Sequence, residues 1–141
     1  MRRFGFVVTL CATRLMFGGG LFEIFPVSGK ANDVSYEFNI TAADVAHTPI
    51  WSAGSDNPPL SARSADNVAR RQLQELVPTA RDWVRRQVRL VAFGDNLHWI
   101  YVVEFEPPPL ENVAEFGRDY MRIPVLFDGR VITPKLTPIP K

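Results

Sequence analysis

The chain has very little of the chemistry that most enzymes and metal proteins need. Its 141 residues include one cysteine, Cys11, and two histidines, His47 and His98. A single thiol forms no internal disulfide, and two histidines without paired spacing do not indicate a metal site. The sequence also lacks the motifs of a nucleophilic serine, a phosphate loop and a dinucleotide site. We therefore expect no catalytic residue, no metal ion and no cofactor.

The N-terminal residues have the pattern of a secretory signal. A short basic start precedes an apolar run at residues 4–13, FGFVVTLCAT, which has the length of a signal core. Gly29 and Ala31 are small residues at the spacing that a signal peptidase prefers, which predicts a signal peptide over residues 1–31. Charged residues, a proline and three glycines interrupt the apolar stretch, so no stable membrane span is expected after cleavage. The protein is expected to be periplasmic or extracellular, with membrane tethering by an uncleaved leader as the alternative.

The charge balance argues against a nucleic-acid partner. The whole chain has 16 basic and 15 acidic residues, and the predicted leader holds four of the bases and one of the acids. The remainder therefore carries a net charge of about −2, whereas a nucleic-acid binder needs a basic excess to neutralise phosphates. A hydrophobic fraction of 46% is enough for one globular core.

The residues after the leader divide into a connector, a domain and a tail. Residues 32–60 begin with an alternating strand at 35–40 and continue as a stretch rich in Pro, Gly, Ser and Asn. Trp51 is expected to anchor this connector to the core. Residues 61–134 are the expected domain, and residues 135–141 form a proline-rich tail that is expected to fray.

The clearest element is an amphipathic helix over residues 61–77. Ser61 is suited to cap its N-terminus, Leu60 to pack back on it, and Pro78 to end it. Its apolar residues recur at helical spacing: Ala65, Val68, Ala69, Leu73, Leu76 and Val77. This stripe is expected to cover one face of a sheet.

Four further segments have the composition of strands. Residues 84–93 and 98–106 flank a Gly-Asp-Asn turn and predict one hairpin, and residues 120–127 and 130–133 flank an Asp-Gly turn and predict another. Pro124 favours an edge position for its strand. The expected fold class is α+β, with one amphipathic helix packed on an antiparallel sheet of about four strands.

Three segments carry a family resemblance. They are LSARSADNVARRQL in the helix, HWIYVVEF in the aromatic strand and VLFDGRV at the last turn, where Asp128, Gly129 and Val131 form the ending. From Leu60 to Thr133 the chain resembles the PepSY-like domains of small secreted bacterial proteins. The resemblance implies an interaction module outside the cytoplasm, which contacts peptides, a peptidase or an envelope component and has no catalytic residue.

Two surfaces are candidates for the contact with such a partner. The first combines a proline-rich excursion with a sheet edge, because loops on a rigid scaffold often carry function: Pro107, Pro108, Pro109, Leu110, Phe116 and Arg122. The second is a basic patch that would face an anionic polymer or a membrane surface: Arg70, Arg71, Arg85 and Arg89. The alternative for this patch is neutralisation by acidic side chains within the molecule.

Glu104 and Glu106 supply the best argument for an enzyme. They share one face of a strand, and paired carboxylates can divide acid and base work. The alternative is that they pair across the hairpin with Arg85, Arg86 or Arg89. The leading hypothesis is an exported binding module, with a hydrolase that uses the two glutamates and a structural envelope protein without a discrete ligand as alternatives.

Overall fold

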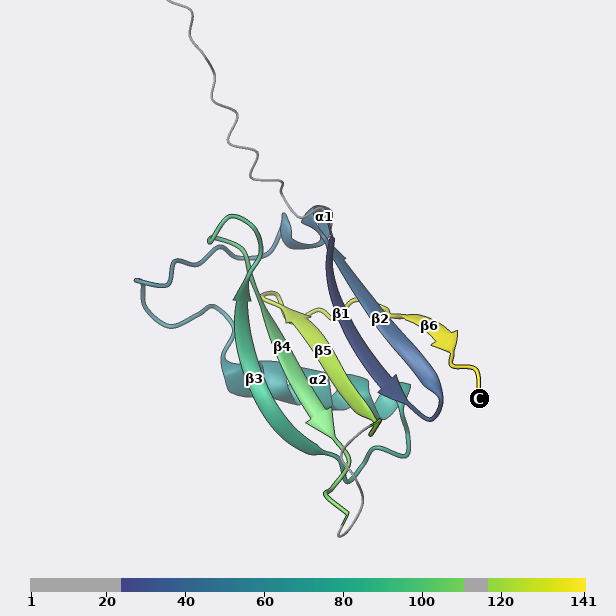
Figure 1. The fold of residues 1–141 in the computed structure, drawn as a ribbon. Coiled ribbons are helices and arrows are strands. Elements are labelled where there is room, and N and C mark those ends of the chain that lie inside the picture. Colours follow the sequence, from purple (N-terminus) through teal and green to yellow (C-terminus); the bar gives the residue numbers. More distant parts are fainter. Residues whose placement is uncertain (1–23, 111–116) are drawn as a thin grey trace, which may run out of the picture.

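One antiparallel sheet and two helices make up the described part of the chain, residues 24–110 and 117–141 of the computed structural model (Figure 1). The strands are β1 (Ile24–Ala31), β2 (Val34–Thr41), β3 (Val84–Ala92), β4 (Trp99–Glu106), β5 (Tyr120–Leu126) and β6 (Lys135–Pro138). The helices are α1 (Ala42–Val45) and α2 (Ala62–Leu76). The strand order across the sheet is β3-β4-β5-β1-β2-β6.

The expected α+β class with about four strands is wrong, because the fold is mostly β and its sheet has six strands. Residues 135–138, expected to fray, form β6 and pair with β2 from Lys135 opposite Glu37 to Pro138 opposite Val34. An edge strand tolerates proline because one of its sides needs no N–H donor. The apparent tail is therefore part of the sheet.

β1 is the second strand absent from the sequence-based scheme, which places residues 24–31 in the leader. It pairs with β2 along its whole length and with β5 at Gly29 and Lys30. Val27 and Ala31 are 5% and 0% exposed. Cleavage of a signal peptide after Ala31 would thus remove an internal strand from the sheet.

The predicted amphipathic helix is present as α2. The side chain of Ser61 accepts a hydrogen bond from the backbone N–H of Ser64, as an N-cap should. The helix lies across β4 and β5 (Figure 1). Its buried residues form the stripe that faces the sheet: Ala65, Ala69 and Leu73.

The two faces of β4 have different surroundings because successive side chains of a strand point to opposite sides. The face toward α2 carries Tyr101, Val103 and Phe105, which are all buried. Two contacts show that this face lies under the helix. The Tyr101 hydroxyl donates to the Leu60 carbonyl at 2.9 Å, and the Arg70 guanidinium of α2 lies 4.9 Å from the Phe105 ring centre. The opposite face carries Ile100, Val102, Glu104 and Glu106.

The predicted strand at residues 130–133 is not formed. The Asp-Gly turn is present, with Gly129 at φ 84°, and the Leu126 N–H donates to the Arg130 carbonyl at 2.9 Å. The chain then crosses to β6 instead of returning beside β5, because the neighbouring position is already occupied by β1.

Pro124 is likewise not at an edge of the sheet, since β5 lies between β4 and β1. The ladder between β5 and β1 includes only Tyr120 and Met121 of β5. No hydrogen bond toward β1 is therefore needed at residue 124, which explains how an internal strand accommodates a proline.

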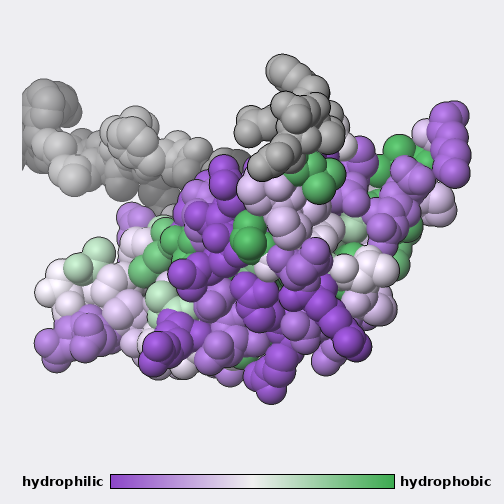
Figure 2. Space-filling model, turned by 90° about the horizontal axis from the view of Figure 1, so that it is seen from below, coloured by the Kyte–Doolittle hydropathy of each residue, from purple (hydrophilic) through white to green (hydrophobic). Residues whose placement is uncertain are grey.

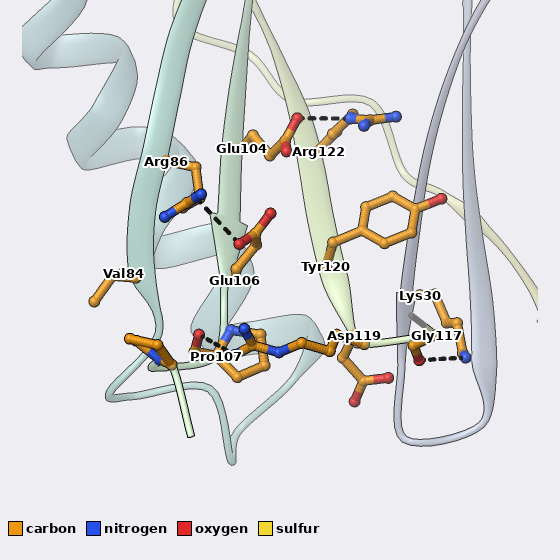
Figure 3. A pocket seen from close by; sticks show the side chains of 12 residues that line it. Lys30, Val84, Arg86, Glu104, Glu106, Pro107, Gly117, Asp119, Tyr120 and Arg122 are labelled. Atoms are coloured by element: carbon orange, nitrogen blue, oxygen red, sulfur yellow. Dashed lines mark hydrogen bonds and ion pairs between the residues drawn. The ribbon is translucent and has the colours of Figure 1, made fainter. Parts of the chain in front are cut away.

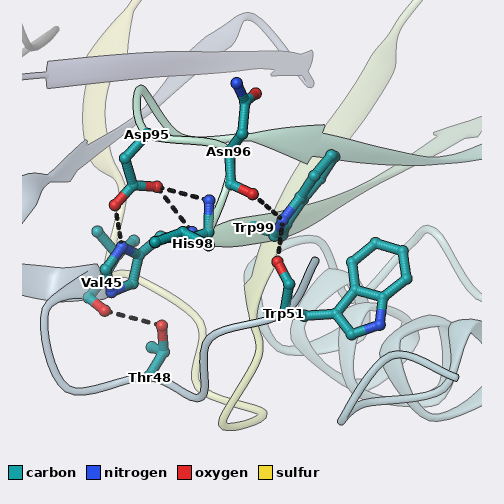
Figure 4. A network of polar contacts seen from close by, with 8 residues as sticks. Val45, Thr48, Trp51, Asp95, Asn96, His98 and Trp99 are labelled. Atoms are coloured by element: carbon teal, nitrogen blue, oxygen red, sulfur yellow. Dashed lines mark hydrogen bonds and ion pairs between the residues drawn. The ribbon is translucent and has the colours of Figure 1, made fainter. Parts of the chain in front are cut away.

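Trp51 anchors the connector between α1 and α2 as expected (Figure 4). Its N–H donates to the Leu97 carbonyl at 2.8 Å, and its carbonyl accepts from the Trp99 indole N–H at 2.8 Å. The two indole rings meet edge to face with centroids 5.4 Å apart. These contacts fix the connector against the start of β4.

We expect Gly29→Ala to destabilise the protein by about 1–3 kcal/mol, the usual cost of overpacking a buried site. A Cβ at residue 29 would collide with Sδ of Met121 and lie 3.2 Å from the Met121 Cα, and Met121 is fully buried. Gly54→Ala is the matched control, because no atom lies within 4 Å of its added Cβ. Urea unfolding compares the two variants, and equal midpoints would contradict this packing.

Candidate binding groove

A groove of about 410 Å³ lies where β4 ends and β5 begins (Figure 3). It opens on the sheet face of Glu104, which is opposite to α2. We call it the charged groove, and its lining comes from β1, β3, β4, β5 and the stem of the loop after β4: Lys30, Val84, Arg86, Glu104, Glu106, Pro107, Pro109, Gly117, Arg118, Asp119, Tyr120 and Arg122.

Glu104 is the most deeply placed carboxylate of the charged groove, with 8% of the residue exposed. It lies between Gln87 of β3 and Arg122 of β5 in register. Its Oε2 accepts hydrogen bonds from Arg122 Nε at 2.7 Å and from Gln87 Nε2 at 3.0 Å. Burial alone would raise the pKa of Glu104, but these hydrogen bonds outweigh burial and hold the pKa below its ordinary value of 4.5. Glu104 is therefore ionised at neutral pH.

Glu106 forms the second ion pair of the groove, with Arg86 Nε at 3.1 Å from its Oε2. The β3–β4 register shifts between Arg85 and Gln87, which makes Arg86 the extra residue of a bulge. A bulge redirects one side chain relative to the regular alternation. Here the redirected side chain is the one that pairs with Glu106.

In both ion pairs the arginine is the outer partner. The side chain of Arg86 is 59% exposed against 28% for Glu106, and that of Arg122 is 40% exposed against 11% for Glu104. At Glu104 and Glu106 a molecule that enters the groove consequently meets the guanidinium before the carboxylate. Asp119 is a third lining carboxylate, and its Oδ2 accepts from the Asn32 N–H at 3.2 Å. The Arg122 guanidinium also lies 5.0 Å from the Tyr120 ring centre, which limits its orientations.

Two cations of the groove hold the stem of the proline-rich loop. Arg118 Nη2 donates to the carbonyls of Pro107 at 2.9 Å and Pro108 at 2.8 Å. Lys30 Nζ donates to the Gly117 carbonyl at 3.1 Å. The Arg118 contacts tie the two ends of the loop to each other, and the Lys30 contact ties its second end to β1.

The structure brings several of the sequence-predicted residues together. Pro107, Pro109 and Arg122 line the same groove as Glu104 and Glu106. Pro108 contributes a carbonyl to Arg118, and Leu110 is 67% exposed beyond the stem. Phe116 lies outside the described residues.

Six lining residues were not among the sequence-based candidates: Lys30, Val84, Gly117, Arg118, Asp119 and Tyr120. Strand alternation alone places Tyr120 on the face of Arg122 and could have found it. Lys30 was assigned to the leader. Arg86 was named as one alternative partner of the two glutamates, and the structure pairs it with Glu106.

The expected basic patch of Arg70, Arg71, Arg85 and Arg89 does not form one surface. Arg70 donates to the Trp83 carbonyl at 3.1 Å, and Arg85 pairs with Asp66 of α2 at 3.0 Å. Arg89 instead lies on the other face of the sheet, where its charge helps to lower the pKa of Glu104. Arg71 is exposed on α2. Arg89 is thus separated from the other three arginines, which lie on α2 or beside it. The sequence does not reveal on which face of the sheet the helix packs.

A second polar network lies at the turn between β3 and β4 (Figure 4). Asp95 Oδ1 accepts from the backbone N–H groups of Leu97 and His98, and Oδ2 lies 2.5 Å from His98 Nδ1. Burial by itself raises the pKa of Asp95, but these hydrogen bonds and the charge of His98 lower it to about 2. The network stabilises the turn, which accounts for it without a catalytic role.

Neither a metal cluster nor a membrane-spanning helix is found in the part of the chain that the structure describes. No three His, Cys, Asp or Glu side chains lie together there in a way that could hold a metal ion. No helix among residues 24–110 and 117–141 is long and apolar enough to cross a bilayer.

The end of the molecule near the groove is mainly hydrophilic, with small separate apolar patches on its described surface (Figure 2). Large apolar patches mark hydrophobic docking sites, so this end is better suited to a polar partner. Comparison with known proteins adds no relative, because no family model, no curated protein and no solved structure matches the chain significantly. The PepSY resemblance therefore stays a prediction.

We expect Glu104→Gln and Arg122→Met to show a coupling energy of about 1–2 kcal/mol in a double-mutant cycle. The pKa of Glu104 is lower in the folded state than its ordinary value of 4.5. The contribution of Glu104 to stability is therefore fully present above pH 4.5 and is lost as the pH falls through the folded-state pKa. Urea unfolding between pH 7 and pH 3 should thus show a smaller loss of stability in Glu104→Gln than in the unmodified protein. A coupling of zero with identical pH profiles would disprove the pair's contribution.

Proposed function

We propose that the protein is an exported, non-catalytic binding protein whose charged groove holds a short extended peptide segment with acidic side chains. The observation that carries the proposal is the order of charges in the groove, with arginines outermost and glutamates beneath them. The outer arginines attract an acidic ligand and repel a basic one.

The ion pairs supply preorganised arginines. Arg86 and Arg122 contact their glutamates through Nε, and a guanidinium has five N–H donors in a rigid fork. The terminal nitrogens retain the geometry that binds a carboxylate through two parallel hydrogen bonds. Since the glutamates already restrict the arginine side chains, less conformational entropy is lost on binding.

The size and walls of the groove fit a short segment of chain. Its volume of about 410 Å³ falls at the lower end of ligand sites, which range over roughly 300–1,000 Å³. Val84, which is 40% exposed, and two prolines supply apolar wall, while Tyr120 adds an aromatic ring.

The two alternatives have less support. A hydrolase that uses Glu104 and Glu106 needs one carboxyl group that keeps its proton, whereas both groups form ion pairs with arginines, Glu104 with Arg122 and Glu106 with Arg86. A structural envelope protein without a ligand does not require a groove with preorganised charges.

The test is an NMR titration of the protein with the acetylated, amidated peptides of four glutamates and of four lysines. We expect the glutamate peptide to shift the resonances of Tyr120 and Arg122, and the lysine peptide to leave them unchanged. Arg86→Gln should weaken binding of the glutamate peptide about tenfold, equivalent to about 1.4 kcal/mol.

Arg71→Gln is the matched control, because it removes the same charge from α2, away from the groove. Unchanged affinity in this variant supports a site in the groove. A loss confined to Arg71→Gln would move the site to the helix, and equal shifts with both peptides would contradict selection by charge.

A further inference from the structure

The position of β1 bears on where an export leader can be removed. Ala31 is fully buried and pairs with Val34, and Asn32 and Asp33 between them have φ of 51° and 60°. The Ala31–Asn32 bond thus belongs to a tight turn between two paired strands. Cleavage there would also take Lys30 out of the charged groove.

A second pair of small residues stands upstream of β1 with the required spacing. Gly18 and Gly20 follow the apolar run of residues 4–13, and they precede Ile24, where β1 begins. Signal peptidases accept small side chains at the third and first positions before the cut. Between Thr13 and Ile24 the sequence offers no other pair of Gly, Ala or Ser at this spacing.

We propose that a signal peptidase cleaves the bond between Gly20 and Leu21, so that the mature chain begins at Leu21 and keeps β1. This inference rests on the export part of the proposed function. Water adds across the peptide bond, which leaves a carboxylate on Gly20 and an amino group on Leu21. Residues 21–23 then connect the new N-terminus to the first strand of the sheet.

The test is expression of the full chain, with a C-terminal tag, in a bacterium whose periplasmic fraction is collected. Intact-mass spectrometry of the purified protein should give the mass of residues 21–141. Gly20→Trp places a bulky side chain directly before the cut and should leave the chain uncleaved at this bond. Gly19→Trp is the matched control at the neighbouring position, where the side chain is not selected, and it should be cleaved as the unmodified chain is.

A mature chain that begins at Asn32, or at any residue other than Leu21, overturns the inference. So does an uncleaved chain in the unmodified protein, or cleavage of Gly20→Trp at the same bond. Peptide binding by the groove is measured on the same purified protein and does not depend on the leader. Failure of the cleavage site is therefore distinguishable from failure of the proposed binding activity.

Discussion

The junction between β1 and β5 holds the two halves of the sheet together. On one side of it lie β3, β4 and β5, and on the other lie β1, β2 and β6. The ladder across it has two residue pairs, Gly29 with Met121 and Lys30 with Tyr120. Gly29 permits the close approach, because a side chain there would collide with the buried Met121. A short ladder with tight packing thus sets the register between the two halves of the sheet.

The register between β1 and β5 also determines which residues face the charged groove. Because successive side chains alternate, the pairing that packs Gly29 against Met121 on the helix side puts Lys30 and Tyr120 on the groove side. Lys30 there holds the loop stem through the Gly117 carbonyl, while Arg122 pairs with Glu104 one strand further along. The core and the charged groove are consequently two sides of one arrangement, and neither is independent of β1.

Local patterns predicted the elements whose periodicity is strong. The helical stripe of α2 and the aromatic alternation of β4 were recognisable because their buried faces repeat regularly. β1 was missed because IFPVSGKA was assigned to the leader, and its four apolar residues are interrupted by a proline, a serine, a glycine and a lysine. Its pairing with β2 and β5 is not visible in the local sequence. The groove was predicted in part: its glutamates and prolines were identified, but the pairing of Glu104 with Arg122 depends on strands brought together by the fold.

Native-state hydrogen exchange measures directly whether β1 is an internal strand that joins the two halves of the sheet. If β1 is an internal strand that joins the two halves, those of its amides that hydrogen-bond to β2 or β5 should exchange only through global unfolding, at the rate found for β4. The edge strand β6 should exchange faster. Exchange of the β1 amides as fast as that of the turn at Asn32 and Asp33 would contradict the account.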